Sequence, residues 1–240
     1  MSQEDTLKRV VPPEMVHLTR LLQFSDTALP VGSFTFSNGL ESALQTGIVK
    51  DPESLLQYVE FMLRQTSRMD GIALLHAHRA AVSGNYDAVV NADRELLCRR
   101  VGEEQQLMLM RVGKKLAELV LGITPSPMLE RWVSDIRAGD TPGCFPIGQA
   151  ISLAHMGASE NEAFIMHQYG VASMILSAAL RLMRIDHRDT QRILFKSQER
   201  VRDDYLAIFS FSLDEMTSFA PVFDVLVAHH ATTHVRLFMN

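Results

Sequence analysis

Helix start signals recur along this chain, and they limit its possible folds more than any other feature. Asp51-Pro52 and Ser126-Pro127 each place a capping residue before a proline, which suits the first turn of a helix. Ser159-Glu160-Asn161-Glu162 has the pattern of a capping box, in which two side chains satisfy the first free amides. Apolar residues at helical spacing follow these signals, so most of the chain is predicted to be helical.

These signals predict an all-α fold, a single-domain helical bundle of about ten helices over residues 1–240. The longest helix runs from the capping box to about Met183, and Asp186 begins the next. Asn38 with Glu41 three residues later also has the spacing of a cap, as does Ser212 with Glu215, and Pro221 suits the start of a final helix. Strand-like alternation is confined to two brief runs, near residues 33–37 and 209–213.

The composition favours a soluble, cytoplasmic globular protein. Apolar residues make up 47% of the chain and charged residues 21%, enough for a sizeable core. A net charge of −5 argues against nucleic acid and anionic membranes as partners. The charged N-terminus predicts a short mobile segment and no signal peptide, and no apolar run reaches the length of a membrane span. Cys98 and Cys144 lie far apart, so no disulfide framework is indicated.

Motifs of common enzymes are missing from the sequence. Val112-Gly113-Lys114-Lys115 comes nearest to a phosphate loop, but the required earlier glycine and the following Ser or Thr are absent. No nucleophile elbow and no zinc-protease motif occurs, so the chain is predicted not to be an enzyme and to need no cofactor. One alternative stays open: His229, His230 and His234 could hold a nickel or zinc ion, as the latter two share a helix face.

The stretch at residues 29–42 is an apolar loop, which needs a cover. Loops are mostly polar because their backbone stays hydrated. Here apolar side chains alternate with turn-forming residues, and either the protein's own core or another molecule must cover them. The residues concerned are Leu29, Pro30, Val31, Gly32, Phe34, Phe36 and Gly39.

Two further segments allow a structural and a functional interpretation. Arg181 and Arg184 share a face at the end of the longest helix, where they either complement the helix dipole or anchor an anionic group of a partner. The tail, about residues 231–240, is unusually apolar for a chain end. It either folds back on its own core or anchors in another protein's groove through Val235, Arg236, Leu237 and Phe238.

Together, the loop, the longest helix and the tail resemble the family of urease accessory protein F, called UreF. Leu29-Pro30-Val31-Gly32 followed by Phe34, Phe36 and Gly39-Leu40-Glu41 is similar to the family's N-terminal signature. MHQYGVASMILSAALRLM resembles its central helix, with Arg181 where the family has Lys or Arg, and HHATTHVRLFMN resembles its C-terminal end. The chain departs from the family pattern at residues 184–187, at Ala231 and at Met239.

The resemblance implies a non-enzymatic, all-helical homodimer that acts as a chaperone in loading nickel into apo-urease. It implies binding to urease accessory protein D, called H in some organisms, through the tail residues Val235, Arg236, Leu237 and Phe238. It also implies binding to the urease accessory GTPase G, with Glu41 and Arg181 at that contact. Two hypotheses therefore remain, an interaction scaffold for urease maturation and a helical metal-binding enzyme that uses the C-terminal histidines.

Overall fold

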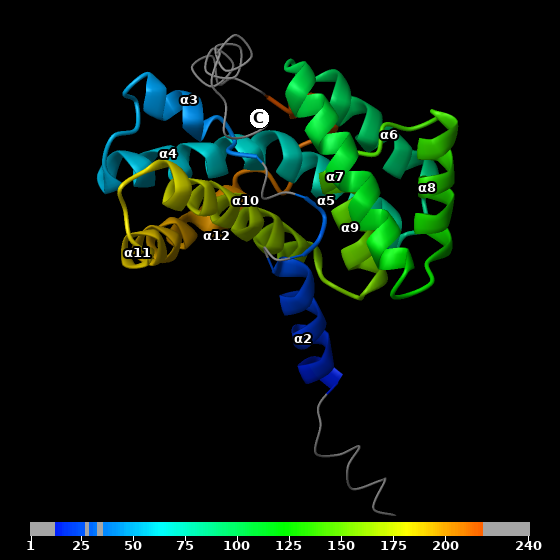
Figure 1. The fold of residues 1–240 in the computed structure, drawn as a ribbon. Coiled ribbons are helices and arrows are strands. Elements are labelled where there is room, and N and C mark those ends of the chain that lie inside the picture. Colours follow the sequence, from blue (N-terminus) through cyan, green and yellow to red (C-terminus); the bar gives the residue numbers. More distant parts are fainter. Residues whose placement is uncertain (1–12, 27–28, 33–35, 218–240) are drawn as a thin grey trace, which may run out of the picture.

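A computed structural model describes residues 13–26, 29–32 and 36–217 of the chain. The helices and helical turns in these ranges confirm the predicted all-α class (Figure 1). The α-helices are α2 (Pro13–Ser25), α3 (Leu40–Gln45), α4 (Pro52–Thr66), α5 (Ile72–Val82), α6 (Tyr86–Cys98), α7 (Glu103–Leu121), α8 (Pro127–Ala138), α9 (Phe145–His155), α10 (Glu160–Leu182), α11 (His187–Ser197) and α12 (Val201–Leu206). A π-helical turn, η2 (Ser67–Gly71), joins α4 to α5, and η3 (Gln198–Arg200) and η4 (Leu213–Glu215) are 3₁₀ turns.

Most of the predicted helix starts are correct at the level of single hydrogen bonds. The carboxylate of Asp51 accepts the backbone N–H of Ser54 at 2.8 Å, and the Ser159 hydroxyl accepts that of Glu162 at 3.3 Å. Asp186 caps α11 in the same way. The box at Ser212 forms as well, but it begins only the short turn η4. The helix predicted after Pro221 lies outside the described residues.

The buried apolar residues form two clusters, which lie in different halves of the structure. The first lies among α5, α6, α7, α8 and α9 and contains Trp132 and Phe164, both fully buried. The second lies among α3, α4 and α11. Figure 1 shows these two groups of helices on opposite sides of α10.

Two long helical paths connect the clusters. Helix α10 places Phe164 in the first cluster and Ile175 in the second. The continuous path from α4 through η2 to α5 does the same, with Leu55 in the second cluster and Leu74 in the first. The start signal at Asp51-Pro52 is local to the beginning of α4 and carries no information about the π-helical turn at its end.

A buried carboxylate holds α6, α8 and the start of α9 together. Asp93 is 0% exposed. Its side chain accepts hydrogen bonds from Trp132 Nε1 at 3.1 Å, Thr141 Oγ1 at 2.8 Å, and the backbone N–H groups of Gly143 and Cys144, both at 2.9 Å. Burial and the nearby carboxylate raise the pKa of the Cys144 thiol, which therefore stays neutral. Cys144 is accordingly a core residue, whereas Cys98 is exposed.

Candidate partner-binding surfaces

The apolar loop before α3 is folded onto the protein's own core at Val31 and Phe36. Val31 and Phe36 are each 4% exposed and belong to the first cluster. Leu29 is half-buried against the same cluster, and Pro30 is exposed. Phe34 lies outside the described residues. At Val31 and Phe36, the apolar loop is therefore buried by the protein's own core and not by another molecule.

The turn into α3 is fixed by two left-handed residues and by two other helices. Asn38 has φ 49° and Gly39 has φ 75°. Glycine adopts this left-handed conformation at little cost because it has no Cβ, and asparagine tolerates it better than most other residues. The Tyr58 hydroxyl of α4 donates to the carbonyl oxygen of Asn38 at 2.5 Å, and the Asn38 amide donates to Met174 Sδ of α10 at 3.5 Å. Helix α3 begins at Leu40 with Gly39 at its N-cap, so the cap predicted at Asn38 is wrong. The left-handed turn there replaces the extended backbone that a side-chain cap requires.

Glu41 and Arg181 lie on neighbouring helices, since α3 packs against α10. Glu41 is in the first turn of α3 and is only 4% exposed. Arg181 is exposed in the last turn of α10, and its Nε donates to the carbonyl oxygen of Ser177 at 3.2 Å. Their contact with a partner stays a prediction.

A cavity of about 370 Å³ lies beneath the loop, between it and helices α7, α9 and α10. Apolar side chains dominate its walls, and the loop contributes Leu29 and Val31. Behind it, His167 Nδ1 lies 2.8 Å from Gln149 Oε1, and His167 Nε2 lies 3.9 Å from a carboxylate oxygen of Asp70. Burial lowers the pKa of His167, which favours the neutral imidazole. Asp70 also pairs with Arg100, so this polar cluster joins η2, α9 and α10.

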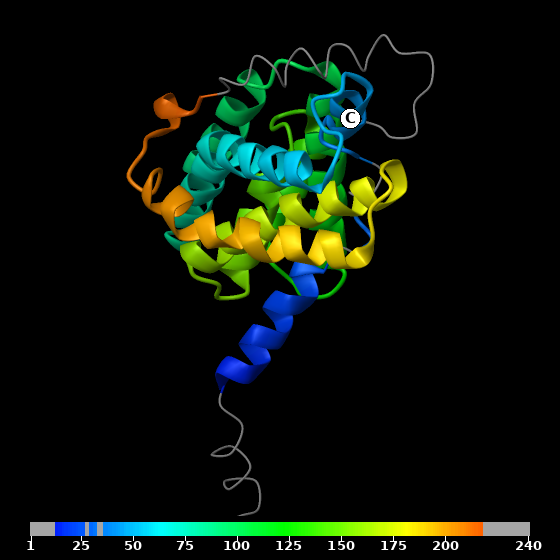
Figure 2. The same ribbon diagram turned by 90° about the vertical axis from the view of Figure 1, so that its left-hand side faces the viewer.

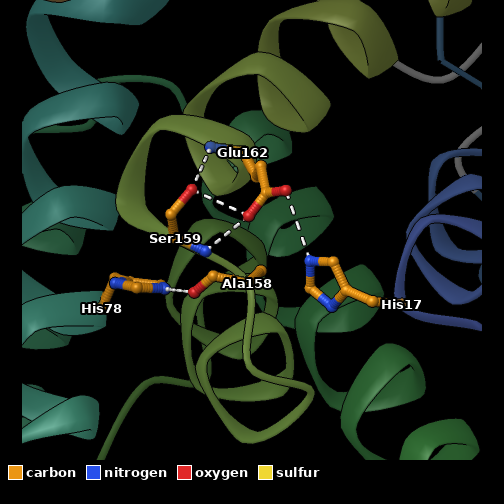
Figure 3. Close-up of polar contacts among 5 residues, drawn as sticks. All are labelled: His17, His78, Ala158, Ser159 and Glu162. Carbon is orange, nitrogen blue, oxygen red and sulfur yellow. Dashed lines mark hydrogen bonds and ion pairs between the residues drawn. The ribbon is translucent and has the colours of Figure 1, made fainter. Parts of the chain in front are cut away.

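Helix α2 projects from the rest of the structure in both ribbon views (Figures 1 and 2). Figure 3 shows a polar contact between α2 and the first turn of α10, where His17 Nε2 lies 3.3 Å from Glu162 Oε1. Hydrogen bonding from the Ser159 backbone holds the pKa of Glu162 below its usual range, so this carboxylate is charged. Figure 3 also shows that His78 Nε2 donates to the carbonyl oxygen of Ala158, the residue before Ser159, at 2.9 Å.

The outward side of α2 carries an apolar stripe. Met15, Leu18 and Leu22 are 57%, 57% and 63% exposed, whereas Leu21 on the inward side is 4% exposed. The spacings of three and four residues place the stripe on one helix face. Because short helices are marginal in water without tertiary packing, a helix with so little buried surface calls for a further contact.

A groove of about 750 Å³ adjoins this stripe. Leu18 and Leu22 form part of its wall, and α10 contributes Ile165, Tyr169 and Gln168. Gln168 is 1% exposed, and both polar atoms of its side chain lack a hydrogen-bond partner. This surface is not among the sites predicted from the sequence. The apolar residues at positions 15, 18 and 22 have the spacing of one helix face. This spacing indicates an apolar face but does not indicate whether the rest of the protein buries it.

The remaining predicted site residues lie outside the described part of the chain. They are the tail residues Val235, Arg236, Leu237 and Phe238 and the histidines His229, His230 and His234. Within residues 13–26, 29–32 and 36–217, no group of three His, Cys, Asp or Glu side chains could hold a metal ion. By length and composition α10 could cross a membrane, but 67% of its apolar window is buried within the structure, as is usual for a core helix.

Comparison with known proteins gives a consistent result. Residues 49–198 match the model of the UreF family. The chain is 44% identical over 223 residues to the urease accessory protein UreF of Yersinia enterocolitica, which covers 93% of this chain and 98% of that protein. The UreF proteins of Yersinia pseudotuberculosis and Yersinia pestis show the same identity and the same coverage.

Proposed function

From the premise that this chain belongs to the UreF family of urease accessory proteins, we propose that it is a non-enzymatic chaperone of urease maturation. It acts in the cytoplasm as a scaffold on which nickel is inserted into the urease apoprotein. Its partners are the accessory protein D or H, the accessory GTPase G and a second copy of itself. The observation that carries this proposal is the identity of 44% over 93% of the chain.

The proposal assigns the partners to different surfaces. The tail, with Val235, Arg236, Leu237 and Phe238, binds the D or H protein. Glu41 and Arg181, on the packed pair α3 and α10, belong to the GTPase contact. A fixed acid and a fixed base on a rigid helical support can favour one conformation of a GTPase by differential contact.

Omission of this chain tests the function as a whole. The urease genes and the other accessory genes are expressed together with and without it, in medium that contains nickel. We expect urease activity and the nickel content of the purified enzyme to fall together when the chain is omitted. Full activity and full nickel content without it would contradict the proposal.

Substitutions at Glu41 and Arg181 test the GTPase contact. Arg181→Ala and Glu41→Gln are expected to weaken GTPase binding by about 10-fold or more, because a desolvated charge contact contributes roughly 2–5 kcal/mol. Glutamine keeps the shape of the buried Glu41 side chain and removes its charge, while one accepting oxygen becomes a donating NH2 group. Titration calorimetry with the purified GTPase measures the effect.

Binding of the D or H protein and the melting temperature are the controls for these two variants. Both are expected to stay near the values of the unmodified protein. A lower melting temperature with a uniform loss of both partners would instead make Arg181 a structural charge at the end of α10.

We infer that the second copy binds through the stripe of α2 and the adjoining groove. A projecting ridge and a groove lie side by side on one protomer, so a two-fold axis can place each ridge in the partner's groove. A polar side chain of the partner can then pair with the buried amide of Gln168, as single buried polar residues fix the register of paired helices.

Charge introduced into the stripe is expected to separate the two copies. The double variant Leu18→Glu, Leu22→Glu should sediment as a monomer at micromolar concentration, where the unmodified chain sediments as a dimer. Leu107→Glu on α7 is the matched control, because Leu107 is 56% exposed and Leu18 is 57% exposed. A double variant that stays dimeric would place the dimer contact elsewhere.

A further inference from the structure

The outer face of α11 combines positive charge with an exposed aromatic ring. The helix buries Thr190, Ile193, Leu194 and Ser197 and packs against α4 and α10. Figure 1 shows it at the edge of the structure. The side chains on its opposite face are exposed, namely Arg188, Gln191, Arg192, Phe195 and Lys196.

Phe195 lies on this face near the C-terminal end of α11. It is 74% exposed, more than Phe61, Tyr169 and Phe209, which are 38%, 36% and 45% exposed. Arg192 precedes it by three residues and Arg188 by seven, so both guanidinium groups lie on the same helix face as the ring. Aromatic residues and arginine are the types enriched at protein interfaces, whereas a solvated helix face favours lysine and glutamate.

The charge of this region is opposite to that of the whole chain. Residues 181–196 contain five Lys and Arg but only two Asp, in a protein of net charge −5. Both aspartates are used at the helix start: Asp186 accepts the N–H groups of Arg188 and Asp189, and Asp189 lies 3.5 Å from the N–H of Asp186. Arg192 Nη1 lies 3.8 Å from Asp189 Oδ1, and the Arg192 side chain is 78% exposed. Because water screens such an exposed ion pair, it does not neutralise the charge of Arg192.

We propose that the outer face of α11 binds an acidic protein surface, with an apolar pocket for Phe195 beside carboxylates that meet Arg188 and Arg192. The partner is the protein that contacts Arg181, because α10 and α11 pack together and the exposed Arg184 follows Arg181 in the connection between them. The inference rests on the proposed function and extends its GTPase contact. A nucleic acid fits less well, since the net charge of the protein repels it.

Two variants of α11 test the inference with the purified GTPase as the probe. Phe195→Asp removes the apolar anchor, and the double variant Arg188→Glu, Arg192→Glu reverses the charge. Each is expected to weaken GTPase binding by more than 10-fold in calorimetry. Raising the salt concentration should weaken binding of the unmodified protein and have less effect on the double variant.

Matched controls come from α7, on the other side of α10. Leu107→Asp places an acid at an exposed apolar position, and Arg111→Glu reverses an exposed charge. Both should bind the GTPase as the unmodified protein does. A melting temperature for each variant shows whether it is folded, and Phe195→Ala serves in place of an unfolded Phe195→Asp.

The outcomes separate this inference from the proposed function. GTPase binding that is unchanged in both α11 variants overturns the inference and leaves the proposed function intact. The inference is also overturned if the α11 variants lose binding to the D or H protein or to the urease apoprotein while GTPase binding is unchanged, because the face then belongs to another partner. Binding of short DNA through the same arginines would overturn it as well. If the unmodified chain binds none of these proteins, both proposals fail.

Discussion

Gly113→Ala is expected to lower the free energy of unfolding by about 3 kcal/mol, the upper part of the usual range for an overpacked core. A Cβ atom at this position of α7 would lie 2.2 Å from the carbonyl oxygen of Gly143 and 2.7 Å from the backbone nitrogen of Phe145. Both are backbone atoms at the start of α9, so no side-chain rotation relieves the clash. Urea denaturation followed by circular dichroism measures the effect.

Gly170→Ala is the matched control within another helix. Apart from the adjacent residues and backbone of its own helix, no atom lies within 4 Å of a Cβ placed there. Alanine should then stabilise the protein by roughly 0.5–1 kcal/mol, since glycine is the weaker helix former. If the two substitutions changed stability equally, close backbone contact would not be the reason for glycine at position 113.

Asp93→Ala is expected to lower the free energy of unfolding by about 3–5 kcal/mol. This is the usual loss when one partner of a buried charged contact is removed. The Trp132 indole, the Thr141 hydroxyl and the amides of Gly143 and Cys144 would all lose their acceptor. Buried donors without a partner are costly because water cannot reach them. The midpoint of urea unfolding should fall accordingly.

Asp87→Ala on the same helix is the control. It shows how much stability is lost when an aspartate without these buried hydrogen bonds is removed. Asp87 is exposed in the first turn of α6, where an acid contributes at most about 1 kcal/mol through the helix dipole. A loss of similar size in both variants would show that Asp93 acts through its charge on α6 and not through its four donors.

Helix starts were predictable from the sequence because a cap is a local arrangement of three or four residues. Asp51, Ser159 and Asp186 form their predicted hydrogen bonds at the starts of α4, α10 and α11. Ser212 forms its box too, yet only a 3₁₀ turn follows. A cap satisfies the first amides, but the length of a helix depends on the apolar face behind it.

The candidate surfaces were predictable only in part, because burial depends on contacts between distant residues. The sequence marked the loop as apolar, but the support of Asn38 by Tyr58 joins residues 20 apart, and the burial of Glu41 follows from the packing of α3. The spacing of the stripe on α2 is the same for a face packed on the core and for an exposed face. Whether an apolar face points inward is settled by the rest of the fold.

The π-helical turn at Ser67–Gly71 sets the phase between the two halves of the protein. Such a turn holds one residue more than an α-helical turn. Deleting one residue from it would restore an α-helix and rotate α5 by about 100° relative to α4. If Leu55 then still faced the second cluster, Leu74 would point away from the first cluster. The loops between helices can gain or lose residues, whereas this segment works as a spacer of fixed length.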